Sequence, residues 1–524
     1  MRSLKLIILS ILGGVILYAG WPPLESPLPL FIGFLPFLWL EEILRRQGRS
    51  HSFFWFLYPG LFTWNILCTW WVWFASPGGA VAMLLLNTLM MTLPFLFYSM
   101  SRNIVGASRA LVFLVLFWLG FEYLHHTWQI AYPWLTLGNG FATAPQLVQF
   151  YEYIGVSGGS LWILLVNVLL FQIMRNPNLR ISLGAAFVLA APVFWSHWLW
   201  NTQSNCVKPE VNMLVVQPNI DPYEKFNEGE ELEQVRNFIK MVEPKITEET
   251  DYIILPETAI VEYLDEAYIN QLPSIRMLVN LIHRNPGIEI ITGASTYRFF
   301  EDPEKRSLTA RQAQSGDWYD SYNTSLRIDS SGVQEIYHKS RLVPGVERMP
   351  YPKILGFLEY LSIDMGGISG SLGSDPEAMA FNTENGPGMA TLICYESVFG
   401  EYVGDFVRKG ADLLLVITND GWWGNTPGHI QHMHYARLRA IEHRKEVVRS
   451  ANTGISCHID DNGRILKRTN WWEPDVIEVS AKALDYRTFF SVNGDVIGKI
   501  SSFLSVFVLI GLWVRRRVLK SGLV

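Results

Sequence analysis

Three side chains that can do covalent chemistry, Glu257, Lys339 and Cys394, each follow a short run that predicts a β-strand. Cys394 also precedes a predicted helix over 397–408. Such a strand-to-helix turn can expose a nucleophile while the helix N-terminus lowers the pKa of its thiol. A carboxylate can accept the thiol proton, and a lysine ammonium can stabilise a developing oxyanion. A nucleophile, a base and an electrostatic stabiliser together predict acyl transfer through a thioester.

Each of these residues also has an ordinary structural interpretation. A cysteine at a strand end is more often a packing residue than a nucleophile. A glutamate after a strand is usually solvated or caps a helix, and a lysine at a hairpin is usually a surface charge. The catalytic interpretation therefore depends on the sequence around the three residues.

The segment that carries them, residues 201–493, has charged residues at ordinary density and alternates predicted strands with amphipathic helices. The dipeptide Asn462-Gly463 is a strong hairpin signal. This order of elements predicts a layered α/β fold with sheet at its core. We expect strands over 211–216, 252–255, 288–291, 325–328, 334–339, 390–394, 413–418, 456–460 and 464–467, and helices over 228–242, 272–283, 397–408 and 429–446.

The rest of the chain has the composition of a membrane protein. Of all 524 residues, 49% are hydrophobic and only 17% are charged, against roughly 25% in ordinary soluble domains. A helix that crosses a bilayer needs about 20 mostly apolar residues. Eight such runs predict seven transmembrane helices over residues 1–200, a catalytic domain over 201–493, and an eighth helix with a basic tail over 494–524. The runs are 4–21, 28–44, 53–74, 80–100, 110–125, 157–174, 181–199 and 496–514.

The positions of Lys and Arg between these runs predict the orientation, because cytoplasmic loops are enriched in both. The loops 22–27, 75–79 and 127–156 contain neither residue, whereas the alternate loops contain several. No Ala-x-Ala cleavage pattern follows the basic start of the chain, so we expect the first run to be retained. The catalytic domain is therefore predicted outside the cytoplasm. Asn65 and Asn87, within two of the runs, are predicted to bond helices together.

Charge and cysteine usage disfavour several other classes of function. The net charge of −6 argues against a nucleic-acid partner. His429, His432 and His434 have a spacing that could bind a metal, but no acidic residue nearby in the sequence completes a ligand set, so we predict neither metal nor cofactor. The cysteines are too few and too scattered for a disulfide framework, although a pairing of Cys206 or Cys457 stays open. All four are Cys68, Cys206, Cys394 and Cys457.

The sequence around the three reactive residues resembles the nitrilase, or carbon–nitrogen hydrolase, superfamily. The matching runs are LPETA around Glu257, YHKSRLVPGVE around Lys339 and LICYESVFG around Cys394. With seven apolar runs before this domain and one after it, the chain is more specifically similar to the apolipoprotein N-acyltransferase family. The resemblance implies an αββα sandwich on eight membrane helices, a Glu–Lys–Cys catalytic triad without metal or cofactor, and a monomer.

The resemblance also implies roles for residues near the triad. Glu347 would position the lysine, Asn323 would lie in the wall of the site, and Phe226 stands where the family commonly has tryptophan. Tyr395 and Glu396 would shape the acyl pocket or the oxyanion site. The run Leu-Val-Pro-Gly-Val-Glu at 342–347 departs from the family's usual Leu-Val-Pro-Phe-Gly-Glu, which leaves the lining of the acyl pocket open.

The reaction implied is a ping-pong transfer of an acyl chain. The donor would be a phospholipid, at the sn-1 position of phosphatidylethanolamine, and the acceptor would be the N-terminal amine of S-diacylglyceryl-cysteine in an apolipoprotein. A hydrocarbon chain that leaves a bilayer loses about 0.8 kcal/mol per CH₂, so a catalyst must meet it at the membrane. The alternatives are a membrane-anchored amidase or nitrilase that hydrolyses a small amide, and a non-catalytic scaffold or transporter.

Two apolar segments are candidates for contact with lipid. The run 351–363, which includes Phe357, is predicted to form a mobile lid that enters the lipid headgroups. An ordinary amphipathic surface helix explains this run equally well. Trp422 and Trp423 are the second candidate, for which core packing is the stronger alternative.

Overall fold

The protein is described by a computed structural model that covers residues 2–201, 207–226, 229–355, 371–382 and 386–521. The chain forms two compact units, each with many contacts between its own residues. The first is helical and comprises Met1–Trp73, Ala80–Thr202 and Asn493–Val524. The second comprises Phe74–Gly79 and Gln203–Val492 and contains the two β-sheets.

Among the described residues, five helices of the first unit are long and apolar enough to cross a membrane. The chain is therefore a membrane protein, but the predicted number of eight spans is not confirmed. Two other apolar helices, α1 (Arg2–Tyr18) and α3 (Phe53–Thr69), have 17 residues each. The five are α5 (Pro77–Val105), α6 (Ala107–Thr127), α7 (Tyr151–Arg175), α8 (Leu179–Trp200) and α15 (Val496–Ser521).

The predicted span over 28–44 is not one helix. The structure has a short 3₁₀ helix, Leu28–Ile32, followed by α2 (Leu35–Arg46), with a break at Gly33 and Phe34. Each piece has a proline in its first turn. Proline lacks an N–H group and is tolerated there but not in a helix interior, so it marks two helix starts.

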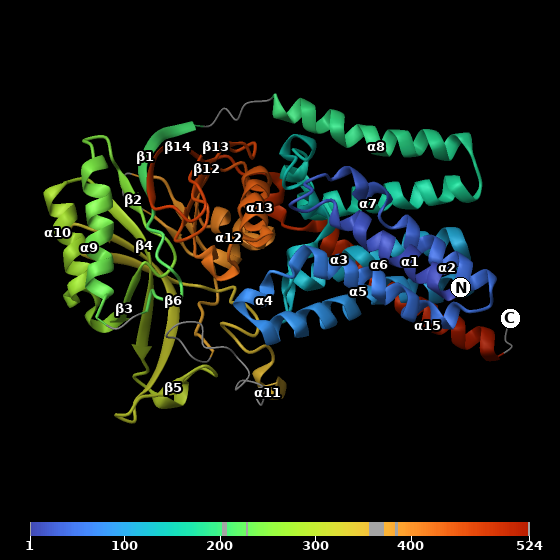
Figure 1. Ribbon diagram of the computed structural model, residues 1–524, viewed down its shortest axis with the longest axis horizontal. Helices are drawn as coiled ribbons and strands as arrows, with labels where there is room; N and C mark the ends of the chain where they lie inside the picture. Colours follow the sequence, from blue (N-terminus) through green and yellow to red (C-terminus); the bar gives the residue numbers. More distant parts are fainter. Residues whose placement is uncertain (1, 202–206, 227–228, 356–370, 383–385, 522–524) are drawn as a thin grey trace. The chain divides into compact units, whose positions relative to one another are not determined.

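Arginines that the sequence assigns to cytoplasmic loops meet in a buried cluster around Glu41 and Glu42 of α2. Arg45 pairs with Glu41 at 2.5 Å, and Arg102 pairs with both glutamates. Arg175 lies 3.7 Å from Glu42. Figure 1 shows both chain termini at this end of the helical unit. The cluster agrees with a common side of the membrane for these loops, as the charge pattern predicts.

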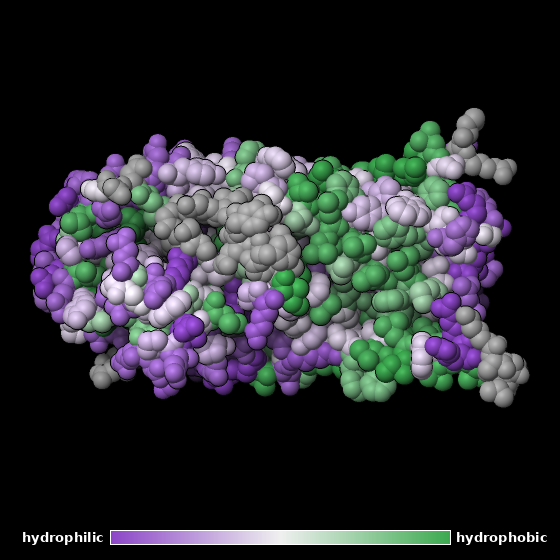
Figure 2. Space-filling model, turned by 90° about the horizontal axis from the view of Figure 1, so that it is seen from below, coloured by the Kyte–Doolittle hydropathy of each residue, from purple (hydrophilic) through white to green (hydrophobic). Residues whose placement is uncertain are grey.

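Polar groups inside the helical unit are bonded to each other, while apolar side chains face outward. Asn87 of α5 donates a hydrogen bond of 2.6 Å to Asn65 of α3, which confirms the predicted bond between helices. Phe187, Phe194 and Phe503 are exposed on α8 and α15. Figure 2 shows hydrophobic surface gathered over the helical unit, with hydrophilic residues at its end. Such a surface suits contact with lipid tails.

The second unit is built from two sheets, each with strands in a defined order. In the first, β1, β2 and β4 are parallel neighbours, and in the second β9, β10 and β11 are parallel neighbours. The first sheet contains β14 (Asp475–Leu484), β1 (Val207–Gln217), β2 (Tyr252–Ile254), β4 (Glu289–Phe299), β6 (Trp318–Asp329), β5 (Arg311–Gln312), β3 (Ile260–Asp265) and β7 (Gly332–His338). The second contains β13 (Ile465–Arg468), β12 (Cys457–Ile459), β11 (Val447–Ala451), β10 (Leu413–Thr418), β9 (Met389–Ile393) and β8 (Ala380–Phe381).

The two sheets are packed face to face between two helical layers (Figure 1). On β1, Leu214 and Val216 join the core beneath α9 (Glu231–Val242) and α10 (Pro273–Arg284). The intervening Val215 is also buried and faces the other side, because side chains alternate along a strand. Outside the second sheet lie α12 (Gly400–Arg408) and α13 (Pro427–His443). This layering is the predicted nitrilase-type α/β architecture.

Several predicted elements have different ends in the structure. The helix expected over 429–446 stops at His443, because Arg444 has a left-handed conformation (φ 49°) and the chain then enters β11. The helix expected over 397–408 is split into a 3₁₀ helix, Cys394–Val398, and α12, which begins at Gly400. β14 was not predicted, although its burial alternates with the period of two that defines a half-exposed strand.

Candidate active site

The predicted nucleophile Cys394 lies at the first residue after β9, in the sharp turn that starts the 3₁₀ helix Cys394–Val398. Its backbone has a φ of 51°, a left-handed conformation that is uncommon for a residue with a Cβ. Such conformations persist only where the surrounding structure holds them, and they cluster at functional sites. Cys394 is partly exposed, whereas its neighbours in the turn are buried. The turn therefore presents one thiol from an otherwise closed surface.

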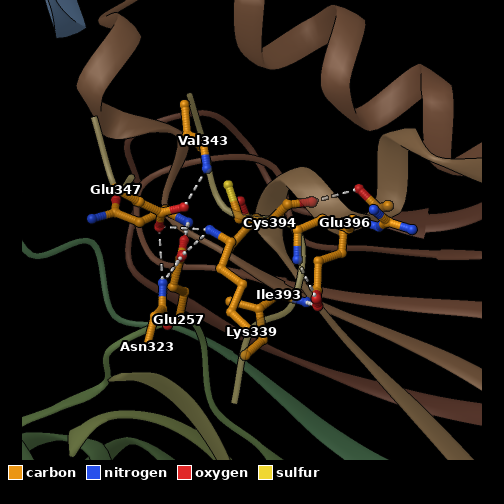
Figure 3. A network of polar contacts seen from close by, with 12 residues as sticks. Glu257, Asn323, Lys339, Val343, Glu347, Ile393, Cys394 and Glu396 are labelled. Carbon is orange, nitrogen blue, oxygen red and sulfur yellow. Dashed lines mark hydrogen bonds and ion pairs between the residues drawn. The ribbon is translucent and has the colours of Figure 1, made fainter. Parts of the chain in front are cut away.

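Glu257 reaches the same place from the other sheet. It follows β2 by three residues and is 7% exposed. Its Oε1 accepts a hydrogen bond from Asn323 Nδ2 at 2.8 Å, and its Oε2 accepts one from the backbone N–H of Asn419 at 2.9 Å. These donors fix the carboxylate in one orientation (Figure 3).

Lys339 follows β7 directly and is almost completely buried, at 1% exposure. Its Nζ donates to Glu347 Oε1 at 2.7 Å and lies 3.4 Å from Glu257 Oε1. Burial alone would favour the neutral amine, but the charges of Glu347 and Glu257 outweigh it and raise the pKa of Lys339 above its ordinary value. The lysine is therefore an ammonium, as an oxyanion stabiliser must be.

The surroundings of the Cys394 thiol favour its neutral form. Burial and the charge of Glu257 raise the pKa of Cys394 well above its ordinary value, and Lys339 offsets only part of this effect. The expectation that a helix N-terminus lowers this pKa is therefore wrong, because the turn contains only a short 3₁₀ helix and the site is enclosed. A thiol of this kind is a weak acid and requires a base at the moment of attack.

Glu347 contacts Lys339, as the resemblance implies, and Tyr395 and Glu396 lie in the turn that begins at Cys394. Glu347 accepts from Lys339 and, through its other oxygen, from the backbone N–H of Val343 at 2.7 Å. Tyr395 packs edge-on against Phe399. Glu396 ties together two segments of backbone, since it accepts from the N–H groups of Ile393 and Ser340, both at 2.8 Å. It therefore joins the cysteine turn to the lysine loop.

A cavity of about 90 Å³ opens beside these groups, room for about three water molecules. Phe226 and Trp422 line it, whereas Trp423 packs edge-on against His432. Phe357 lies outside the described residues. The lining residues are Lys225, Phe226, Glu257, Thr258, Asn323, Val346, Glu347, Leu372, Asn419 and Trp422.

Two polar residues of this cavity, Lys225 and Asn419, were missed in the sequence. Lys225 is 1% exposed and donates from Nζ to the backbone oxygen of Glu257 at 2.9 Å. Burial lowers the pKa of Lys225 to about 7, although Glu257 opposes the shift. Asn419 directly follows β10, so its position at a strand end was a usable signal. Lys225 lies in a turn-rich segment with no comparable pattern.

The three histidines of α13 do not form one site. His429 stacks on Trp471, with ring centroids 3.7 Å apart, and His434 contacts Arg437. Among the described residues, one group of a thiol, a carboxylate and an imidazole has the spacing of a metal site. It consists of Cys394, Asp420 and His432. The Arg449 guanidinium lies 2.5 Å from Asp420 and repels a second cation there. The donor set therefore fits a metal poorly.

A buried histidine next to the lysine gives a testable pH dependence. His338 bonds Glu266 through Nε2 at 2.7 Å and Asp375 through Nδ1 at 3.0 Å. Burial opposes the imidazolium, but Asp375 and Glu266 outweigh it and raise the pKa of His338 above 6.5. The pKa of Asp375 is in turn lowered from 3.8, because the hydrogen bond from His338 outweighs burial.

His338→Gln is therefore expected to destabilise the protein by about 2 kcal/mol, the usual size of a hydrogen bond to a charged group. Because the pKa of His338 is raised in the folded protein, its bonds to Glu266 and Asp375 stabilise the fold fully below pH 6.5. This stabilisation is lost as the pH rises through the folded-state pKa. A lowered Asp375 pKa stabilises above 3.8 and is lost at lower pH. Thermal unfolding should show the largest difference between wild type and variant from pH 3.8 to 6.5. His283→Gln, which changes a histidine bonded only to the backbone oxygen of exposed Ser330, is the control.

Comparisons with known proteins agree with this architecture. The model of the carbon-nitrogen hydrolase family matches residues 215–487, and that of the apolipoprotein N-acyltransferase N-terminal domain matches residues 13–169. An apolipoprotein N-acyltransferase of Chlorobaculum tepidum is 31% identical over 93% of both chains. One of Geobacter metallireducens is 26% identical over 93% of this chain and 92% of its own. Among solved structures, Saccharomyces cerevisiae Nit3, of the nitrilase superfamily, is 17% identical with a TM-score of 0.37, covering 57% of this chain and 96% of its own.

Proposed function

This chain belongs to the apolipoprotein N-acyltransferase family, and we propose that it moves an acyl chain from a phospholipid to a lipoprotein through a thioester on Cys394. One observation carries the proposal. Cys394, Glu257 and Lys339 come together from two sheets beside a cavity that Glu257 lines, in a chain that also has helices long and apolar enough to cross a membrane. An enzyme for a soluble amide has no need of those helices.

In the first half-reaction, the Glu257 carboxylate takes the Cys394 proton and the thiolate attacks the ester carbonyl carbon of the donor. The carbonyl oxygen becomes an oxyanion, which the Lys339 ammonium stabilises. The carbon–oxygen bond to glycerol then breaks, and Glu257 returns the proton to the departing alkoxide. The products are a thioacyl enzyme and a lysophospholipid.

In the second half-reaction, the N-terminal amine of the S-diacylglyceryl-cysteine attacks the thioester carbonyl. Glu257 accepts the amine proton and Lys339 again holds the oxyanion. The carbon–sulfur bond breaks, the amide is released, and the proton passes from Glu257 to the thiolate. The sn-1 chain of phosphatidylethanolamine is the proposed donor, and the periplasmic side of the inner membrane is the proposed location.

The proposal is tested by the mass of the peptide that contains Cys394. Incubation of the purified protein with phosphatidylethanolamine should add one acyl group that hydroxylamine removes. A diacylglyceryl-cysteine peptide should then remove the adduct and gain the same acyl mass. An adduct that forms from a soluble amide but not from phospholipid would contradict the transferase and favour the hydrolase.

Lys339→Met is expected to slow formation of this adduct by about 10²–10³, the usual cost of one oxyanion donor. The variant keeps the length of the side chain but loses the charge that faces both intermediates. Because it also leaves Glu257 and Glu347 without their shared cation, thermal unfolding must be measured in parallel. A folded Lys339→Met protein that acylates at the wild-type rate would remove the lysine from the mechanism.

A further inference from the structure

A second polar network adjoins the nucleophile. It contains His432 of α13, Asp420 and Arg449, which are all at most 1% exposed. His432 Nδ1 lies 3.0 Å from Asp420 Oδ1, and Arg449 Nη2 lies 2.5 Å from Asp420 Oδ2. None of these three side chains has a role in the steps above.

The protonation state of Asp420 determines how the imidazole of His432 is oriented. Its Oδ1 also accepts from Thr418 Oγ1 at 2.9 Å. Burial would favour the neutral acid, but Arg449 and His432 outweigh it and lower the pKa of Asp420 well below its ordinary value. Asp420 is thus a carboxylate, so Nδ1 of His432 donates its proton to it. The other imidazole nitrogen is directed to the cysteine turn.

The second imidazole nitrogen, Nε2 of His432, contacts the backbone of Cys394. His432 Nε2 lies 3.2 Å from the carbonyl oxygen of Cys394 and 3.0 Å from Ser397 Oγ. Ser397 Oγ donates to the same carbonyl oxygen at 2.7 Å. One imidazole nitrogen, one Asp420 oxygen and the Cys394 sulfur also lie within 4.8 Å of one another. The imidazole thus adjoins both the thiol and the strained peptide that carries it.

We propose that His432, oriented by Asp420, is a positioning residue that holds the left-handed Cys394 turn and makes its thiol reactive. A left-handed cysteine costs free energy that its surroundings must offset. Ser397 Oγ donates to the Cys394 carbonyl oxygen and contacts His432 Nε2, so the imidazole holds in place the donor that provides this offset. A polarised imidazole beside the sulfur also favours the thiolate over the thiol. The inference rests on the proposed function only in that Cys394 is the nucleophile.

Other charged groups near the sulfur also shift the equilibrium between the Cys394 thiol and its thiolate. Glu257 disfavours the thiolate, Lys339 favours it, and Asp420 disfavours it. Arg449 lies 3.1 Å from Nδ1 of His432, and Trp423 packs edge-on against the imidazole ring. Removal of His432 leaves the charge of Asp420 beside the sulfur with less compensation. The thiol of the variant should therefore ionise at a higher pH than that of wild type.

The test is the rate at which iodoacetamide alkylates Cys394 in the full-length protein, measured by mass spectrometry between pH 6 and pH 10. In His432→Asn we expect a rate lower by about 10- to 100-fold at neutral pH, the equivalent of one hydrogen bond to a charged group. The whole curve of rate against pH should move to higher pH by about one unit. His432→Gln, whose amide can extend toward the position of Nε2, should recover most of the rate. His434→Asn removes another buried histidine of α13 and should change neither quantity.

A rate equal to that of wild type at every pH, in a folded His432→Asn protein, would overturn the proposal. If thermal unfolding shows that this variant does not fold, Ser397→Ala replaces it, because that change removes one donor to the Cys394 oxygen and leaves Asp420 and His432 paired. Its alkylation should also be slower than that of wild type, and an unchanged rate would overturn the proposal. Alkylation requires no lipid, so a failure of phosphatidylethanolamine to acylate wild type would refute the proposed donor and leave this inference intact.

Discussion

Cys394→Ala is expected to abolish both the acyl adduct and the transfer of acyl groups to the diacylglyceryl-cysteine peptide. No rate above background should remain, because Cys394 is the one described cysteine whose thiol is not fully buried. Of the other described cysteines, Cys68 and Cys457 are completely buried. Burial raises the pKa of Cys457 to about 11, which makes it a poor nucleophile as well as an inaccessible one.

The matched control is Cys457→Ala, which removes a thiol from β12 of the same unit. This variant should form the adduct at a rate close to that of wild type, with at most a lower unfolding temperature. Cys394→Ser should be folded but inactive, because a serine hydroxyl is far less acidic than a thiol. An adduct that persists in Cys394→Ala, on any peptide, would refute the proposed nucleophile.

Glu257→Gln is the substitution with the second large expected effect. It should slow thioester formation by about 10²–10⁴, because a positioned base usually contributes that much to the rate. Glutamine has nearly the same shape and can still accept one hydrogen bond from Asn323 or Asn419. It cannot take a proton from Cys394, whose raised pKa leaves the thiol protonated in the resting enzyme. The acyl adduct, followed by mass over time, should therefore accumulate slowly.

The control for this change is Glu262→Gln, five residues along the chain. Glu262 accepts from the backbone N–H of Ser274 at 3.2 Å and is not among the residues that line the cavity. It should acylate at the wild-type rate. If Glu257→Gln formed the thioester as fast as Glu262→Gln, the proton acceptor would have to be another group, and the mechanism proposed above would be wrong.

Where the sequence predicted well, the signal was local. The run 413–418 forms β10 with the bounds expected, because a strand buried on both faces is a continuous apolar run. The apolar helices and the arginines of one membrane side were recognised from length and charge alone. Where the prediction failed, partners distant in the sequence decided the outcome. The end of α13 depends on pairing between β10 and β11. The broken span at 28–44 is an exception, because its two prolines are local signals within the span itself.

By itself, the sequence determined that this is a membrane protein with an α/β unit and that three reactive residue types follow predicted strands. These features depend on neighbours a few residues apart, which hydrophobic period and charge describe directly. Only the tertiary structure decided that Lys339 contacts a glutamate 82 positions away and that the Cys394 thiol is a weak acid. It also decided that Lys225 adjoins Glu257 and that His432 adjoins Cys394. The reason is physical: the charge state of a buried group is set by burial and by charges within a few ångströms, and those distances arise only when two sheets pack together.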